Sequence, residues 1–237
     1  MRFLFILALL VLVSGCSKKE VRTEIPETEQ PEKFLKYGDE FYQNGDYDNA
    51  FRAYGYIYEN YPTSREYIDA AIGLSRCYGA LQDYDKGFDI LYDLLQNNLI
   101  PTKVPQIYNA IGEFYERSAG ISEQLSGAGG SDYRNAIDYY SKSIKYPNSE
   151  DLNAKGYAQY RIGVLYEKLD ETPKAVEAYE LAQNQYQGTE WAGRAEQNIS
   201  DINKRVQLRN EYELRDLLPE QPDSAAVPTT PSDTTEN

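Results

Sequence analysis

Residues 31–64 read PEKFLKYGDEFYQNGDYDNAFRAYGYIYENYPTS. In this stretch a first small residue, Gly38, is followed three positions later by Phe41, and a second, Ala50, is followed four positions later by Tyr54. Offsets of three and four residues place two side chains on the same face of a helix. A small residue lets another helix approach closely, and the large ring one turn away fills the groove beside it. The stretch therefore predicts two helices packed against each other as a hairpin.

The same pattern of small and large residues recurs three times further along the chain. The first small residues are Gly38, Ser75, Gly112 and Gly163, the second are Ala50, Gly87, Ala136 and Ala175, and the large residues that follow these are Tyr54, Leu91, Tyr140 and Tyr179. The two small residues lie twelve positions apart in the first, second and fourth copies and twenty-four positions apart in the third copy. We therefore expect an insertion at residues 117–131. It is interpreted either as a lengthened helix followed by a flexible loop or as a protruding contact element.

This pattern resembles the tetratricopeptide repeat. The first copy carries the signature residues of that family at Phe34, Gly38, Phe41, Ala50, Tyr54 and Pro62. The fourth copy departs from the family pattern, because Gln159 replaces the leading aromatic residue and the terminal proline is missing. The resemblance implies an all-α solenoid of about four helix-turn-helix repeats over residues 32–218, closed by a C-terminal capping helix. We expect this last helix to run from Thr189 to about Leu218. Its apolar residues leave a second role open, as a docking helix for a partner.

Tetratricopeptide solenoids bind peptides or helices in a concave groove lined by the first helix of each repeat, which we call the A helix. Transferring the groove positions of the family onto this sequence gives five candidate partner-binding residues: Tyr42, Arg76, Asn109, Tyr157 and Tyr160. The same positions also include Leu35, Asp39, Ile72, Glu113 and Val164. They lack the lysine and asparagine set of the subfamily that clamps C-terminal carboxylates. Tyrosine offers a large, rigid contact area with a polar tip, although most of the 23 tyrosines are expected to pack within the repeats.

The beginning of the chain indicates an exported lipoprotein. A short basic start is followed by an apolar run at residues 3–13 and by small residues leading to Cys16. A helix of that length covers about half of a ~30 Å hydrocarbon core. The segment resembles a bacterial lipobox, which implies a signal peptide at residues 1–15 and covalent lipid, including palmitate, on Cys16. An ordinary signal peptide or a short membrane anchor is the alternative.

Two further segments have the composition of unstructured chain. Residues 16–31 are polar and charged and contain prolines, which predicts a flexible tether behind the lipidated cysteine. Residues 219–237 are rich in proline, serine, threonine and aspartate, which predicts a disordered tail. The repeats therefore lie between a tether and a tail.

Composition excludes several classes of function. The chain has no histidine, so it can form neither a Ser-His-Asp nor a Cys-His catalytic pair. Its net charge of -14 opposes nucleic-acid binding, which needs clustered lysine and arginine. Cys77 lies in an apolar stretch and is interpreted as a buried packing residue, and carboxylate pairs such as Asp46 with Asp48 stand at turns, where helix capping explains them. We expect no enzymatic activity, no metal, no cofactor beyond the lipid on Cys16 and no small-molecule substrate.

Two repeat endings, Tyr61-Pro-Thr-Ser64 and Tyr146-Pro-Asn-Ser149, resemble those of bacterial envelope lipoproteins. A serine or threonine of each ending, Thr63 or Ser64 in the first and Ser149 in the second, is expected to cap the helix that follows. The nearest resemblance is to the BamD-like lipoproteins of outer-membrane protein assembly and to the Tol-Pal-associated repeat proteins. The first resemblance implies a scaffold for outer-membrane protein assembly that binds envelope proteins in its groove. Its lipid would hold it at the outer membrane, facing the periplasm. The alternatives are a Tol-Pal or cell-division accessory factor, or an accessory subunit of a secretion, peptidoglycan or polysaccharide system.

The lipid anchor predicts a simple change of location. A Cys16→Ser variant has no thiol to acylate, so it should move from the membrane fraction to the soluble fraction on ultracentrifugation of lysed cells. A Cys77→Ser variant is the matched control and should stay with the membranes. Retention of Cys16→Ser in the membrane fraction would contradict the lipobox interpretation.

Overall fold

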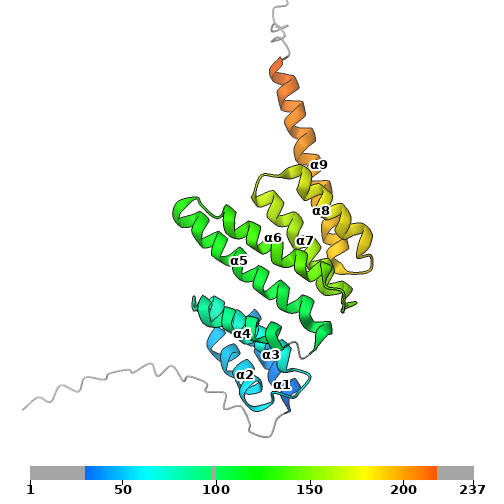
Figure 1. Ribbon diagram of the computed structural model, residues 1–237. Coiled ribbons are helices and arrows are strands. Elements are labelled where there is room, and N and C mark those ends of the chain that lie inside the picture. Colours follow the sequence, from blue (N-terminus) through cyan, green and yellow to red (C-terminus); the bar gives the residue numbers. More distant parts are fainter. Residues whose placement is uncertain (1–29, 98–99, 218–237) are drawn as a thin grey trace, which may run out of the picture.

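The computed structural model describes residues 30–97 and 100–217, and all regular elements within them are helical (Figure 1). The elements are α1 (Pro31–Gln43), α2 (Tyr47–Asn60), α3 (Tyr67–Ala80), α4 (Tyr84–Asn97), the 3-10 turn η1 (Pro101–Lys103), α5 (Val104–Ser126), α6 (Gly130–Lys145), α7 (Leu152–Lys168), α8 (Thr172–Gln185) and α9 (Glu190–Leu217). Helices α1 to α8 pair as four successive hairpins, and α9 packs on the last one. The expected all-α solenoid of four repeats with a C-terminal helix is confirmed.

Four expectations concern residues that the structure does not describe. The signal peptide at residues 1–15, the lipidation site Cys16, residues 17–29 of the tether and the tail at residues 219–237 lie outside the described residues. Among the helices that are described, none combines the length and apolar character needed to cross a bilayer.

The turn inside a hairpin uses a residue with positive φ. Gly45, Gln82 and Asp170 each follow the first small residue of their repeat by seven positions, with φ of 76°, 66° and 57°. Glycine adopts this left-handed conformation without a steric penalty, whereas glutamine and aspartate adopt it at some cost. In the first hairpin Asp46 then caps α2, because its side chain accepts a hydrogen bond from the Asn49 backbone N–H at 3.2 Å.

The expectation that Ser64 and Ser149 cap the following helices is wrong. Helix α3 begins after Glu66, whose side chain makes no capping bond, and α7 is capped by Asp151, which accepts from the Ala154 N–H at 2.9 Å. The Ser149 hydroxyl instead donates to the Thr102 carbonyl at 2.9 Å. It therefore joins two repeats at their ends and does not start a helix.

Aromatic rings of the second helices, which we call B helices, lie directly on glycines of the A helices. A Cβ atom built on Gly38 would be 2.5 Å from the Tyr54 ring, and one on Gly73 would be 2.6 Å from the same ring. The corresponding distances are 2.8 Å from Gly112 to the Tyr140 ring and 2.5 Å from Gly163 to the Tyr179 ring. Since real Cβ atoms essentially never come that close, only glycine permits this spacing between the helices.

Each of these three buried rings is also held at its hydroxyl end. Tyr54 donates to Asp39 at 2.7 Å, Tyr140 donates to Glu116 at 2.6 Å, and Tyr179 donates to Glu167 at 2.7 Å. All three acceptors belong to the A helix of the same hairpin. The ring thus fills the space above a glycine while its polar tip reaches a carboxylate at the edge of the core.

The insertion of the third repeat is mostly helix. Helix α5 continues to Ser126, and a short turn with Gly127 at φ 70° leads into α6. The extension is tied back by the Tyr133 hydroxyl, which donates to Glu123 at 2.6 Å. Leu125, close to the tip, is 82% exposed.

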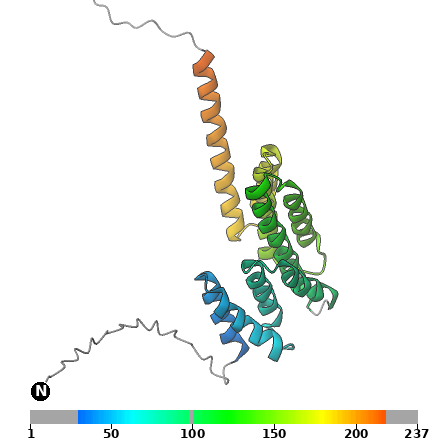
Figure 2. The same ribbon diagram turned by 90° about the vertical axis from the view of Figure 1, so that its left-hand side faces the viewer.

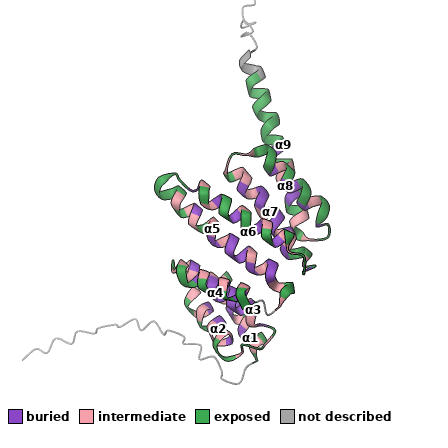
Figure 3. Cartoon of the chain, in the orientation of Figure 1, coloured by how far each residue is buried: buried purple, intermediate pink, exposed green. Residues whose placement is uncertain are grey.

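Helix α9 has a packed half and an exposed half. Ala195 and Ile202 are buried against the fourth hairpin. Beyond them the helix projects from the solenoid (Figure 2), and its side chains up to residue 213 are exposed (Figure 3). Leu208 and Tyr212 are the most exposed of the large hydrophobic side chains on this projecting half.

Replacing Gly163 with alanine tests the ring-on-glycine contact. The added methyl group would meet the fully buried Tyr179 ring, which cannot swing away because its hydroxyl is bonded to Glu167 and Asn198. We expect the free energy of unfolding to fall by about 1–3 kcal/mol, seen as a lower urea midpoint. The control is Gly193→Ala on the exposed face of α9, where a Cβ meets nothing and helix propensity should add about 0.5–1 kcal/mol. Equal midpoints for the two variants would contradict this account.

Candidate functional site

A hollow of about 430 Å³ opens between the A helices, and we call it the A-helix hollow. Its lining comes from α1, α3, α5 and α7, with one residue each from α2 and α9. The lining residues are Leu35, Asp39, Tyr54, Asp69, Ile72, Gly73, Arg76, Gln106, Asn109, Glu113, Asn153, Ala154, Tyr157 and Trp191. It therefore crosses all four repeats and reaches the C-terminal helix.

Three of the five predicted partner-binding residues line this hollow, namely Arg76, Asn109 and Tyr157. Tyr42 and Tyr160 do not line it. The Tyr42 hydroxyl accepts a hydrogen bond from Arg117 at 3.4 Å, and its ring lies beside another tyrosine of the first hairpin. Tyr160 packs between the rings of Tyr179 and Trp191, with centroid distances of 5.7 Å to each.

Sequence reasoning missed several lining residues that a longer helical register could have found. Asp69 lies seven residues before Arg76 on α3, and Gln106 lies seven before Glu113 on α5. A separation of seven residues returns to the same helical face. Extending each predicted A-helix face by one or two turns toward its N-terminus would therefore have included them. Trp191 carried no such signal, because α9 was interpreted as a cap or as a docking helix.

Arg76 and Glu113 form a two-pronged ion pair across the hollow. Arg76 Nε donates to Glu113 Oε2 at 2.9 Å, and Nη2 donates to Oε1 at 3.0 Å. The adjacent Glu113 carboxylate raises the pKa of the Arg76 guanidinium. The pair fixes α3 against α5, and among the described residues Arg76 is the one lysine or arginine that lines the hollow.

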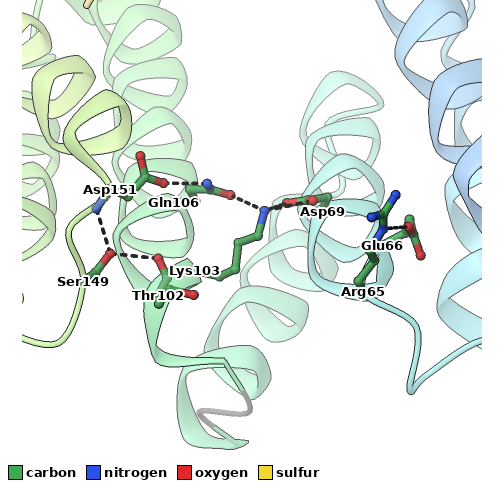
Figure 4. Close-up of polar contacts among 8 residues, drawn as sticks. All are labelled: Arg65, Glu66, Asp69, Thr102, Lys103, Gln106, Ser149 and Asp151. Atoms are coloured by element: carbon green, nitrogen blue, oxygen red, sulfur yellow. Dashed lines mark hydrogen bonds and ion pairs between the residues drawn. The ribbon is translucent and has the colours of Figure 1, made fainter.

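A polar network joins the starts of three A helices at the edge of the hollow (Figure 4). Lys103 Nζ donates to both Asp69 oxygens, at 2.8 and 3.0 Å, and to Gln106 Oε1 at 3.4 Å. Gln106 Nε2 in turn donates to Asp151 at 2.7 Å. Lys103 thereby balances the charge of Asp69 and links α3, α5 and α7.

The far end of the hollow is aromatic. The Tyr157 and Trp191 rings meet edge to face, with centroids 4.8 Å apart and an interplanar angle of 69°. Trp191 Nε1 donates to Asn153 Oδ1 at 2.9 Å, which fixes the indole of α9 against α7. Burial raises the pKa of the Tyr157 hydroxyl. Tyr157 is thus a neutral aromatic wall at any physiological pH.

Cys77 is buried in the core and does not line the hollow. Burial raises the pKa of the Cys77 thiol to about 12, and this thiol is fully buried. A thiol in that state is neither a nucleophile nor a metal ligand at neutral pH. Within residues 30–97 and 100–217 there is also no group of three or more Cys, Asp or Glu side chains placed to hold a metal ion.

Comparison with protein families agrees with this architecture. The family model described as tetratricopeptide repeat matches residues 34–64 and residues 157–189, which fall on the first and the fourth hairpin. Among solved structures, the crystal structure of MamA protein is similar at 20% sequence identity and a TM-score of 0.41, covering 81% of this chain and 98% of that chain. No curated protein matches the sequence.

Proposed function

We propose that this chain is a non-catalytic scaffold that binds a segment of a partner protein in the A-helix hollow. The observation that carries the proposal is the hollow itself, which runs across α1, α3, α5 and α7 and ends at an aromatic wall on α9. Tetratricopeptide repeat domains generally mediate protein–protein interaction. A site shared by six helices suits an elongated ligand better than a compact one.

The lining of the hollow has the properties of a protein-binding surface. Tyr157 and Trp191 supply rigid aromatic area, and residues of these types dominate the binding energy of many interfaces. Polar side chains from α3 and α5 stand beside them, already held in place by the Arg76–Glu113 pair and the Lys103 network. A surface that is ordered before binding loses less entropy when a partner docks.

The proposed setting is the bacterial cell envelope. It rests on the sequence before residue 30, where Cys16 ends a lipobox-like segment. We propose that lipid on Cys16 holds the chain at the outer membrane, facing the periplasm, and that outer-membrane protein assembly is the process it serves. Tol-Pal or cell-division complexes, and secretion, peptidoglycan or polysaccharide systems, are the competing settings.

Affinity purification from crosslinked membranes tests both the site and the setting. The full chain, a Tyr157→Ala/Trp191→Ala variant and a Leu208→Ala/Tyr212→Ala variant would be recovered in parallel and their partners identified by mass spectrometry. We expect the hollow variant to lose the partner by about tenfold or more, since two aromatic contacts are each worth over about 1 kcal/mol. The control variant changes the exposed end of α9 and should retain the partner.

Three outcomes of this purification have distinct meanings. Loss of the partner from the Leu208→Ala/Tyr212→Ala variant alone would show that the projecting half of α9 is the docking element. That result would contradict the hollow as the binding site. Recovery of the barrel-assembly machine supports the proposed process, whereas recovery of Tol-Pal proteins or glycan enzymes contradicts it. Because Tyr157 also packs against Tyr140, each variant is compared by its unfolding midpoint, and Trp191→Ala alone serves as the second test.

A further inference from the structure

We propose that the A-helix hollow selects cationic segments of its partner, with a partner N–H group donating to Asn109 Oδ1 and a lysine or arginine side chain lying against Asp39. This inference rests on the proposed function, because it names the chemistry of the segment that the hollow receives. Two observations that do not depend on each other carry it: one concerns an unused hydrogen-bond acceptor, and the other concerns charge.

The unused acceptor is the side-chain oxygen of Asn109. Asn109 is only 4% exposed and lines the middle of the hollow. Its Nδ2 donates to the Ala154 carbonyl at 2.8 Å, and because a carbonyl can only accept, this bond fixes which end of the amide is nitrogen. The oxygen at the other end is buried and has no hydrogen-bond partner among the described residues. A buried acceptor without a donor is costly, so a ligand that brings an N–H group removes that cost.

The charge of the hollow is the second observation. Three carboxylates line it, from Asp39, Asp69 and Glu113, against the single guanidinium of Arg76. Arg76 is engaged with Glu113, and Lys103 balances Asp69. The ion pairs found among the described residues do not include Asp39, which accepts a hydrogen bond from the Tyr54 hydroxyl at 2.7 Å. The negative charge that remains therefore lies at the α1 end of the hollow.

These features disfavour one ligand class and favour another. An acidic segment would meet Asp39 without finding a free cation in the lining, because the guanidinium of Arg76 is already bonded through two of its nitrogens. A basic segment meets acceptors instead, and the aliphatic stems of lysine and arginine pack well on the aromatic wall of Tyr157 and Trp191. The hollow thus offers hydrogen-bond acceptors to a donor-rich ligand.

Selection from a random peptide library tests the inference even while the natural partner is unidentified. The purified full chain would be panned against the library, and the binding peptides would be sequenced and compared in composition with the unselected pool. We expect enrichment in lysine and arginine and depletion in aspartate and glutamate. The affinity of an enriched peptide would then be measured for the full chain and for its variants through the fluorescence of Trp191.

Two variants address the two observations separately, each with a matched control. Asp39→Asn removes the charge and keeps an oxygen that can accept from the Tyr54 hydroxyl. We expect this variant to bind the enriched basic peptide with about fivefold lower affinity. Asp138→Asn makes the same change on the exposed face of α6 and should leave the affinity unchanged. Asn109→Leu removes the acceptor and should also cost about fivefold. Its control is Gln159→Met, because Gln159 makes a similar buried bond to a backbone carbonyl, that of Ala178, away from the hollow.

The possible results distinguish failure of the charge selection from failure of the proposed peptide-binding function. Enriched peptides that are neutral or acidic, or basic peptides that bind Asp39→Asn as tightly as the unchanged chain, would overturn the charge selection and leave peptide binding intact. A library that yields no binding peptide at all would contradict the proposed function together with the inference. Asp39→Asn keeps the test valid even if Asn109→Leu proves too unstable to measure.

Discussion

In three of the four hairpins a buried tyrosine ring lies on a glycine of the neighbouring helix, and this contact sets the spacing of the two helices. Tyr54, Tyr140 and Tyr179 each occupy space that any Cβ atom on the facing glycine would fill. The ring sets how closely the two helices of a hairpin approach, and thereby how the A helices stand relative to one another. In the second hairpin Leu91 takes the place of the tyrosine, and the ring of Phe114 from α5 covers Gly87 instead.

The same tyrosines connect one repeat to the next. Glu116 accepts a hydrogen bond from the Tyr140 hydroxyl of its own hairpin and also forms an ion pair with Arg161 of the following A helix. Glu167 accepts the Tyr179 hydroxyl and pairs with Arg205 of α9. In each case one carboxylate therefore binds the buried tyrosine of its own hairpin and an arginine of the element that follows. This arrangement holds the A helices in the order that builds the hollow, and it brings the first turn of α9, with Trp191, to its end.

The sequence was sufficient for the fold because the small and large residues keep one register through four repeats. It located part of the site for the same reason, since Arg76, Asn109 and Tyr157 lie on equivalent faces of three A helices, and the register fixes the direction of those faces. Tyr42 and Tyr160 lie outside the lining, because the final position of each ring depends on how the helices stack, which the register does not specify. The contacts of Trp191 with α7 and of Ser149 with Thr102 join elements that are distant in sequence, so no local sequence pattern predicts them. The cell envelope setting depends on residues before position 30 and stays a prediction.

Site-specific photocrosslinking in cells shows whether partners dock on the A-helix face. A photoreactive phenylalanine analogue would replace Leu35 or Tyr157 in the hollow. The comparison position is Tyr58 of α2, which does not line the hollow. We expect the two hollow positions to crosslink to the same partner protein and position 58 not to crosslink to it. Crosslinking of that partner from position 58 alone would contradict docking on the A-helix face.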